Sequence, residues 1–156
     1  MGQRADRPLP QTATSQPSAA IARACQALTP TVRAMTTHDI DEQAALLIGW
    51  NQTYDQISAG PFNGSFFEAD VGRASLFREI TSSSLHQSGA LASQTIAIGV
   101  PITLRGQATF CGQRCDGMQL HIVSGNDAFE FVSPSGLDIV GLVMTEHELG
   151  SGLNED

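Results

Sequence analysis

Between Asp39 and Thr81 the chain reads DIDEQAALLIGWNQTYDQISAGPFNGSFFEADVGRASLFREIT, and this stretch decides the fold. Asp39 can cap a helix, because its short side chain accepts hydrogen bonds from the first unpaired backbone N–H groups. Apolar residues then recur at roughly helical spacing, at Ala44, Ala45, Leu47 and Ile48. Gly49 tolerates the positive φ that commonly ends a helix. We therefore expect a short helix here, followed directly by Trp50, the only tryptophan.

From Phe62 the apolar period drops to two, which is typical of strands. Two runs rich in aromatic and β-branched residues, PFNGSFFEADV and ASLFREIT, are separated by a turn at Asp70, Gly72 and Arg73. The stretch as a whole thus predicts one helix followed by a β-hairpin.

This order of residues resembles the N-terminal, effector-binding and dimerisation domain of AraC-type transcription regulators. The resemblance rests on a D-x-D-E-x-A helix that leads to G-W-x-Q-x-Y-D-Q, here Asp39–Ala44 and Gly49–Gln56. It continues through Phe62–Gly64, Leu76–Glu79, Gly99–Pro101, Phe110–Gly112 and Asp138–Gly141. It implies a cupin-like fold, a small-molecule effector, a homodimer and a role in transcription regulation. The helix-turn-helix domain of that family has no counterpart in this chain.

Charge argues against direct nucleic-acid binding by this chain. It carries 16 acidic and 8 basic residues, a formal net charge of −8, and it contains no lysine. Clustered Lys and Arg supply most non-specific affinity for phosphates, and the arginines here are scattered. We expect contact with DNA only through a helix-turn-helix domain outside this chain.

Length and composition indicate one domain in a reducing compartment. A chain of 156 residues can bury one sizeable core. No stretch approaches the roughly 18 apolar residues of a membrane span, and the N-terminus lacks the apolar core of a secretion signal. Three cysteines, an odd number without an export signal, indicate reduced thiols. We expect a cytoplasmic protein without membrane association.

Three segments are expected along the chain. Residues 1–30 begin with MGQRADRPLPQTATSQPS, which has little to bury, so they predict a disordered or weakly helical leader. Residues 31–145 form the predicted cupin-like domain. Residues 146–156 are the expected start of an interdomain linker or tail, because TEHELGSGLNED begins like a capped helix and then meets Gly150 and Gly152.

Short strands are predicted after the hairpin, whereas Ser82–Gln94 has the composition of a loop. The candidate strands are Thr95–Val100, Gln107–Cys111, Met118–Ser124, Ala128–Ser133 and Leu137–Thr145. Turn residues separate them, as in Gly125-Asn126-Asp127 and Pro134-Ser135-Gly136. The pattern favours a mainly β fold, a barrel or a sandwich. Together with the resemblance, it implies an antiparallel jelly-roll barrel of cupin type with a short N-terminal helix and a possible C-terminal helix start.

Alternation within these strands predicts which side chains face the core. Met118, Leu120 and Ile122 share one apolar face, with Gln119 and His121 opposite. Phe129 and Phe131 likewise oppose Ala128 and Glu130.

No catalytic or metal-binding motif is present. Cupin enzymes usually bind metal through an H-x-H pair, whereas the four histidines here, His38, His86, His121 and His147, are widely spaced. Cys111 and Cys115 lack the second pair of a zinc ribbon. We expect Cys111 to be buried beside Phe110 and Cys115 to lie at the turn; the alternative is a redox-sensing thiol close to Arg114. A nucleophile elbow is also absent. The sequence predicts no metal, no cofactor and no catalysis.

A ligand pocket is expected from the resemblance, because barrels of this class hold small molecules between aromatic walls. The candidate ligand-binding residues are Trp50, Tyr54, Phe66, Phe77, Arg78, His86, Ile98 and Phe129. Arg78 is either an exposed strand charge or the group that recognises an anionic effector. Trp50 and Tyr54 either cover the barrel or anchor the helix to it, and His86 is a possible donor in the loop after the hairpin.

The leading hypothesis is a non-enzymatic sensor that relays effector binding to a DNA-binding domain. One alternative is a metal-dependent cupin enzyme whose histidines are assembled by folding. Another is an interaction module without a ligand, whose barrel interior is filled by side chains.

Overall fold

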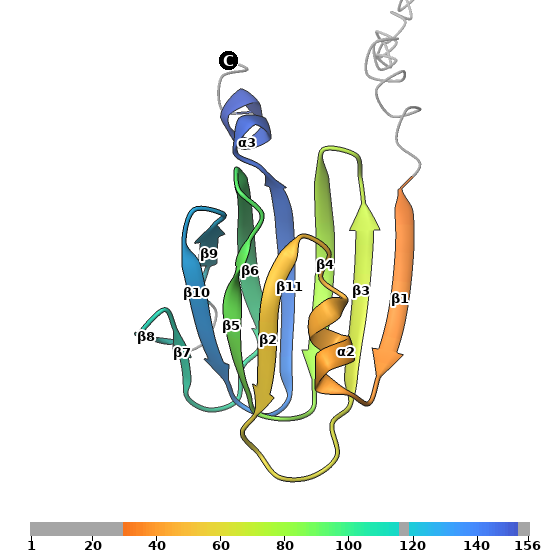
Figure 1. Cartoon of the computed structure of the whole chain (residues 1–156), viewed down its shortest axis with the longest axis vertical. Coiled ribbons are helices and arrows are strands. Elements are labelled where there is room, and N and C mark those ends of the chain that lie inside the picture. Colours follow the sequence, from red (N-terminus) through yellow and green to blue (C-terminus); the bar gives the residue numbers. More distant parts are fainter. Residues whose placement is uncertain (1–29, 116–118, 153–156) are drawn as a thin grey trace, which may run out of the picture.

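Two antiparallel sheets packed face to face make up the molecule (Figure 1). The computed structural model describes residues 30–115 and 119–152. The six-stranded sheet has the order β1 (Thr31–Thr37), β3 (Gly64–Asp70), β4 (Ala74–Thr81), β11 (Leu137–Thr145), β6 (Thr95–Thr103) and β9 (His121–Ser124). The five-stranded sheet has the order β2 (Trp50–Gln56), β5 (Leu85–Leu91), β10 (Ala128–Ser133), β7 (Ala108–Phe110) and β8 (Gln113–Cys115). The mainly β, antiparallel architecture is the one expected from the sequence.

Only two short helices accompany the sheets, α2 (Ile40–Ala45) and α3 (Glu146–Gly152), among the residues that the structure describes. The predicted leader lies outside the described residues apart from Pro30, as do Cys25 and Met118. No helix within the described ranges is long and apolar enough to span a membrane.

The helix and hairpin of the deciding stretch are confirmed. Oδ1 of Asp39 accepts hydrogen bonds from the backbone N–H groups of Asp41 (2.8 Å) and Glu42 (3.1 Å), which caps α2. Strands β3 and β4 pair along their whole length, and the N–H of Gly72 donates to Oδ1 of Asp70 (2.7 Å) in the turn between them. Gly72 has the positive φ of +84° that this turn requires.

Helix α2 ends earlier than predicted, at Ala45 rather than at Gly49. Because the chain leaves the helix there, Ala45 and Ile48 are exposed, while Leu46 and Leu47 turn inward and are buried. Gly49, with a φ of +83°, then redirects the chain into β2. Figure 1 shows α2 lying beside β2 and in front of the lower part of β4, where the five-stranded sheet ends.

The prediction of a loop over Ser82–Gln94 is wrong, because β5 occupies Leu85–Leu91. This strand pairs with both β2 and β10, so backbone hydrogen bonds on two sides stabilise a segment of weak intrinsic β propensity. Gly89 fits this crowded position, since a Cβ built there would overlap the carbonyl oxygen of Asn51. Strands β1, β2 and β8 were also not predicted.

The predicted facing of β9 is reversed. His121 and Val123 are buried against the core, whereas Leu120 (65% exposed) and Ile122 (53% exposed) point outward. The error has a physical cause: the outer face of the six-stranded sheet is itself apolar, so hydrophobicity does not distinguish its two sides. In β10 the prediction is correct, since Phe129 and Phe131 are buried.

The two described cysteines are also reversed relative to the prediction. Cys111 is exposed and Cys115 is buried. Cys111 adopts a positive φ of +46° and begins the tight turn from β7 to β8 with Gly112, which carries its side chain away from Phe110 and the core. Cys115 instead joins a buried cluster with Ala108 and Phe131.

Candidate functional site

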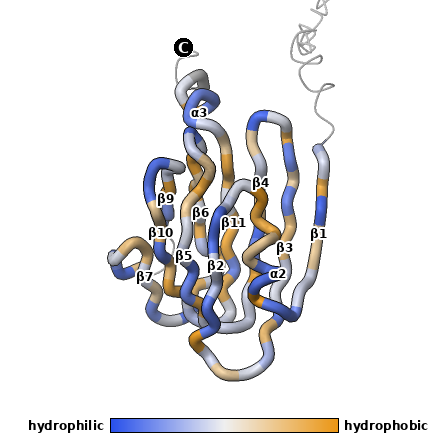
Figure 2. Tube along the Cα trace, viewed as in Figure 1, coloured by the Kyte–Doolittle hydropathy of each residue, from blue (hydrophilic) through white to orange (hydrophobic). Residues whose placement is uncertain are grey.

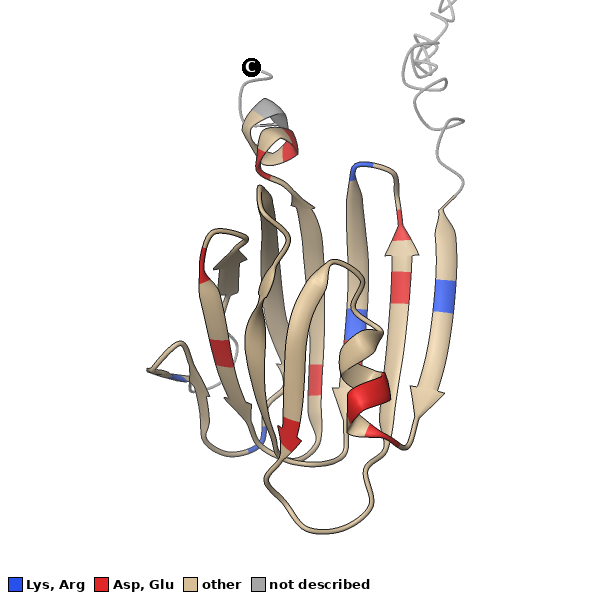
Figure 3. Cartoon of the chain, viewed as in Figure 1, with Lys and Arg blue, Asp and Glu red and all other residues tan. Residues whose placement is uncertain are grey.

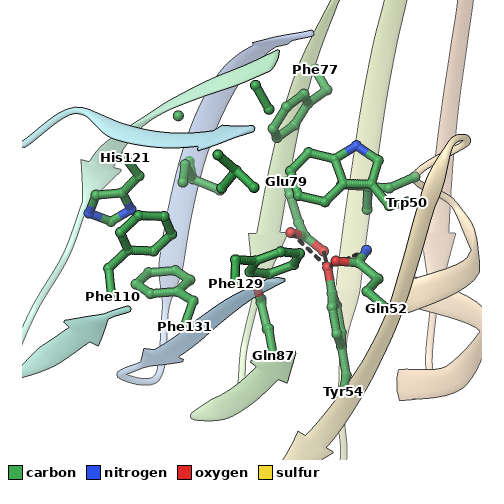
Figure 4. Close-up of a pocket in the computed structure, with 15 residues that line it drawn as sticks. Trp50, Gln52, Tyr54, Phe77, Glu79, Gln87, Phe110, His121, Phe129 and Phe131 are labelled. Carbon is green, nitrogen blue, oxygen red and sulfur yellow. Dashed lines mark hydrogen bonds between the residues drawn. The ribbon is translucent and has the colours of Figure 1, made fainter. Parts of the chain in front are cut away.

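A small cavity of about 50 Å³ lies between the two sheets (Figure 4). Much of its wall is aromatic, formed by Trp50, Tyr54, Phe77, Phe110, Phe129 and Phe131. Four polar residues, Gln52, Glu79, Gln87 and His121, complete this unusual lining. The cavity therefore brings polar side chains into contact with aromatic residues of the core.

Strand β2 supplies three of these side chains by simple alternation. Trp50, Gln52 and Tyr54 occupy every second position of the strand, so they project from its same face into the cavity. The W-x-Q-x-Y motif is thus the inner face of a strand, with Asn51, Thr53 and Asp55 facing outward. Trp50 and Tyr54 share this inner face.

Glu79 places a carboxyl group in the interior, where the side chain is only 3% exposed. Nε2 of Gln43 donates to its Oε1 (2.9 Å), and the phenol of Tyr54 donates to the same oxygen (3.0 Å). None of the salt bridges among the described residues includes Glu79. Burial raises the pKa of Glu79, because a charged carboxylate loses its hydration there.

A network of hydrogen bonds extends from Glu79 into helix α2. Oγ1 of Thr37 donates to Oε1 of Gln43 (3.0 Å), which orients the Gln43 amide toward Glu79. Nε2 of Gln52 donates to the Tyr54 oxygen (3.2 Å) and to the Ala44 carbonyl (3.1 Å). Hydrogen bonds between side chains therefore link the cavity to β1, α2 and β2.

Tyr54 itself stays protonated over the ordinary pH range. Burial raises its pKa well above the usual value, and the nearby Glu79 charge adds to the effect. Tyr54 is consequently a permanent hydrogen-bond donor to Glu79, not an acid.

Two other polar residues of the cavity lack hydrogen-bond partners. Nε2 of Gln87 and both ring nitrogens of His121 are buried without a partner. The His121 ring stacks on Phe110 with a centroid distance of 4.5 Å and meets the edge of Phe131 at 5.1 Å. Burial lowers the pKa of His121, which favours its neutral form. Unpaired buried groups of this kind are rare and costly. Oγ1 of Thr81 and Oγ of Ser133, which do not line the cavity, are also buried without a partner.

The size of the cavity limits what it can hold without rearrangement. A water molecule requires about 10–15 Å³ by the same measure, whereas drug-sized ligands occupy about 300–1,000 Å³. The volume of about 50 Å³ suits a molecule of only a few non-hydrogen atoms.

Trp50 separates this cavity from a larger hollow at the end of the sandwich. It lines the interior cavity and also an outer hollow of about 350 Å³ bounded by Gly49, Arg73 and Glu148. Its ring meets Phe77 and Phe129 edge to face, at centroid distances of 6.2 Å and 5.4 Å. Trp50 is the residue that lines both spaces.

Half of the eight predicted ligand-binding residues meet at the cavity: Trp50, Tyr54, Phe77 and Phe129. Phe66 lies behind them, stacked on Phe77 with a centroid distance of 6.3 Å and almost fully buried.

The remaining three predicted residues lie elsewhere. Arg78 and Ile98 are on the outer face of the six-stranded sheet, where they line a different hollow. The guanidinium of Arg78 donates two hydrogen bonds to Asp138 (2.9 and 2.7 Å), which lowers the pKa of that carboxyl. His86 belongs to β5 rather than to a loop, and it lies between Asp55 (3.6 Å) and Glu130 (2.6 Å) on the outside of the five-stranded sheet.

Sequence analysis did not propose Gln43, Gln52, Glu79, Gln87 and His121 as site residues. One signal in the sequence could have identified Gln52. Trp50, Gln52 and Tyr54 alternate as in a strand, which places Gln52 on the same face as the two aromatic residues. For Glu79, the alternation in β4 did not show which face of the strand is buried. In the structure the face with Phe77 and Glu79 packs against the core.

The fold does not gather the histidines into a metal site. His38 contacts Asn63, His86 is on an outer face, His121 is inside the sandwich and His147 belongs to α3. Among the described residues there is no group of three His, Cys, Asp or Glu side chains that could hold a metal ion.

Two solved structures are similar to this chain. No family model matches the chain. An RmlC-like cupin from Shewanella frigidimarina is similar with a TM-score of 0.42 and 8% identity, over 61% of this chain and 85% of that chain. A cupin-2 domain from Rhodospirillum rubrum is similar with a TM-score of 0.41 and 15% identity, over 70% of this chain and 84% of that chain.

Proposed function

We propose that this chain is a non-enzymatic sensor domain that binds a small effector between its two sheets. In this proposal it acts as the effector-binding and dimerisation part of an AraC-type regulator, in the cytoplasm, and relays binding to a helix-turn-helix domain outside the chain. The regulatory role is supported by the residues that resemble that family, from Asp39 to Gln56 and onward.

The observation that carries the proposal is the buried polar set around Glu79. A buried acid without a cationic partner destabilises a fold, as do the unpaired Gln87 and His121. Proteins retain such destabilising groups mainly at catalytic or binding sites. A cavity that brings these three residues and an aromatic wall together is suited to an effector.

The hydrogen-bond network offers a physical route for the signal. A ligand that draws Glu79 toward itself competes with Gln43 and Tyr54 for the carboxyl oxygens. Gln43 lies on α2 and is held by Thr37 of β1, so a change at Glu79 biases the position of both elements. Differential affinity for two such arrangements is what a population shift requires.

A second candidate is favoured by the small volume of the cavity. An interior of about 50 Å³ is nearly filled by side chains, as an interaction module without any ligand would be.

The two candidates are separated by native mass spectrometry of the purified chain together with fluorescence of Trp50. The single tryptophan lines the cavity, so its emission reports on occupancy without a label. A retained organic molecule, or a saturable change in emission with fractions of a metabolite extract, supports the sensor. An empty chain that responds to no fraction supports the ligandless module, and a stoichiometric transition metal would contradict both.

A further inference from the structure

The chemistry of the cavity indicates the class of ligand, on the premise that the proposed sensor function is correct. Oε1 of Glu79 accepts both short hydrogen bonds, from Gln43 and Tyr54. Oε2 receives only a longer contact of 3.2 Å from the same Tyr54 hydroxyl. A carboxylate oxygen has room for two acceptor contacts, so Oε2 can accept another donor.

The groups around this carboxyl favour a positive charge. Trp50, Phe77 and Phe129 surround the cavity, and aromatic faces attract cations. A cation bound there would also supply the charged partner that buried carboxylates normally have. An anion would instead face the Glu79 charge in a poorly hydrated space.

Two unpaired polar side chains of the lining, Gln87 on β5 and His121 on β9, select for a second polar group on the ligand. Nε2 of Gln87 is a donor without an acceptor, and a neutral His121 offers one donor and one acceptor. A hydroxyl or carbonyl oxygen on the ligand would accept from Gln87.

We infer that the cavity binds a small protonated amine of a few non-hydrogen atoms, whose ammonium group donates to Oε2 of Glu79. A hydroxyl or carbonyl oxygen on the same molecule pairs with Gln87. Trp50 moves aside to admit the ligand and then contacts its cationic end.

The test titrates Trp50 emission of the full chain with three probes of similar size: ethanolamine hydrochloride, methylammonium chloride and neutral methanol. Sodium chloride serves as the ionic-strength control. For ligands of two to four non-hydrogen atoms the expected dissociation constants are about millimolar or weaker. The amines should give saturable changes, ethanolamine at the lower concentration, and methanol should give none.

Variants decide the role of each group. Glu79→Gln keeps the size of the side chain and should weaken ethanolamine binding by about tenfold or more, while Gln87→Leu should weaken ethanolamine more than methylammonium. Thr53→Val, on the outer face of β2, is the matched control and should leave both titrations unchanged. Circular dichroism shows whether each variant is folded.

Three outcomes would overturn the inference. These are equal responses to amine and methanol, an unchanged ethanolamine affinity in folded Glu79→Gln, or a neutral or anionic molecule retained in native mass spectrometry. The last outcome rejects the amine while the sensor function stands. No response to any probe or metabolite fraction rejects both.

An independent observation concerns the outer face of the six-stranded sheet. The register places Ala69, Leu76, Leu142, Ile98 and Ile122 in one row across five neighbouring strands. A hollow of about 680 Å³ lies on this face, lined in part by Phe67, Val100 and Val140. Figure 2 shows β6 and β11 as largely hydrophobic, in contrast to β2 of the other sheet.

Charge distribution points to a second copy of this chain as the occupant. Arg78 and Asp138 are the charged residues on the outer face of these strands, and they neutralise each other in a bidentate pair. Strands β6 and β9 carry no Asp, Glu, Lys or Arg (Figure 3). Two chains of net charge −8 repel each other, and a neutral face is where they can meet with the least repulsion.

The area of the face is sufficient for a dimer. Five strands about 4.8 Å apart and about 20–25 Å long present roughly 500–600 Å². Two copies would together bury roughly 1,000–1,200 Å², which reaches the lower range of specific interfaces. The largest apolar patch on a typical monomer is about 300–600 Å² and is often functional, so a face of this size is a candidate interface.

We propose that two copies of the chain associate through this outer face about a two-fold axis. Sedimentation velocity of the full chain should show a dimer at about 10–50 µM. The double variant Leu76→Lys with Ile122→Lys should be a folded monomer, since both side chains are about half exposed already. Ile57→Lys, at an equally exposed position outside this face, should remain dimeric. A wild-type monomer, or a dimer that persists in the folded double variant, would overturn the proposal.

Discussion

The phenol of Tyr54 on β2 donates a hydrogen bond to the buried carboxyl of Glu79 on β4, with 3.0 Å between the oxygens. The two strands belong to different sheets, so this bond spans the interior of the sandwich. It is one of two short hydrogen bonds that Glu79 receives, the other coming from Gln43. The pair therefore fixes the distance between the sheets at the wall of the cavity.

Tyr54→Phe tests how much this bond contributes to stability. The substitution removes a donor from Glu79 and an acceptor from Gln52, while it keeps the ring in place. Leaving a buried polar group with one partner fewer costs about 1–3 kcal/mol, so the free energy of unfolding should fall by that amount. Urea unfolding followed by Trp50 fluorescence measures it. In Thr53→Val, which removes only the exposed bond to Ser88, the loss should stay below about 0.5 kcal/mol.

Glu79→Gln should change the pH dependence of stability. The folded-state pKa of Glu79 is raised, so its favourable contribution is present below the unfolded pKa and is lost as pH rises through the folded pKa. Tyr54 contacts the carboxyl and remains protonated, and His121 lines the same cavity. Wild type and variant should be similarly stable near about pH 4, and the variant should gain relative to wild type near about pH 8.

The difference between wild-type and variant unfolding free energies, measured at several pH values, checks this prediction. Contributions from other groups, such as the Arg78–Asp138 pair, are common to both proteins and cancel in the difference. A constant difference across the range would mean that Glu79 does not titrate with a raised pKa.

The fold class could be predicted from the sequence because helix caps, turn residues and strand-like alternation act locally. Asp39 acts through its own side chain and Gly72 through the conformation of its own backbone, so their roles can be inferred without tertiary information. The stretches Ala128–Ser133 and Leu137–Thr145 combine apolar residues with turn residues at their ends, and both are strands within those bounds.

The site was less predictable because its residues are defined by tertiary packing. Gln87 lies in a segment of loop-like composition that becomes a strand only between β2 and β10. His121 was expected to face outward, since its apolar neighbours Leu120 and Ile122 suggested the opposite facing for the strand. A sheet with two apolar faces gives no alternation from which the buried side can be inferred.

His86→Asn tests the charged group on the outside of the five-stranded sheet. The hydrogen bond to Glu130 chiefly raises the pKa of His86, and Asp55 adds to it. The stabilisation is therefore fully present below the unfolded pKa and is lost as pH rises through the raised folded pKa. Both carboxylates are largely exposed, so the variant should lose less than about 1 kcal/mol near about pH 5.5 and almost nothing near about pH 9.

Titration of the His86 ring protons by NMR measures the pKa directly, and Glu130→Gln should bring it down. The effect should also shrink at about 1 M salt, since exposed pairs are screened. A His86 pKa that is unaffected by the loss of Glu130 would show that the contact contributes little in solution.

Gly141→Ala should disturb the cavity through Phe77. A Cβ on Gly141 would overlap the Cζ and Cε1 atoms of the Phe77 ring and would lie 3.1 Å from the carbonyl oxygen of Ile98. The ring is held between Trp50 and Phe66, so it can yield only by moving toward the cavity. Overpacking of this kind costs about 1–3 kcal/mol.

A double-mutant cycle with Phe77→Leu isolates the contact between the two positions. Phe77→Leu alone removes buried area and should destabilise, but combined with Gly141→Ala it also relieves the overlap, so the two effects should be non-additive by about 0.5–3 kcal/mol. Gly150→Ala is the control, because a Cβ there meets no atom within 4 Å and should be nearly neutral or slightly stabilising. If the losses from Gly141→Ala and Phe77→Leu simply add, then the Phe77 ring is not what excludes a side chain at position 141.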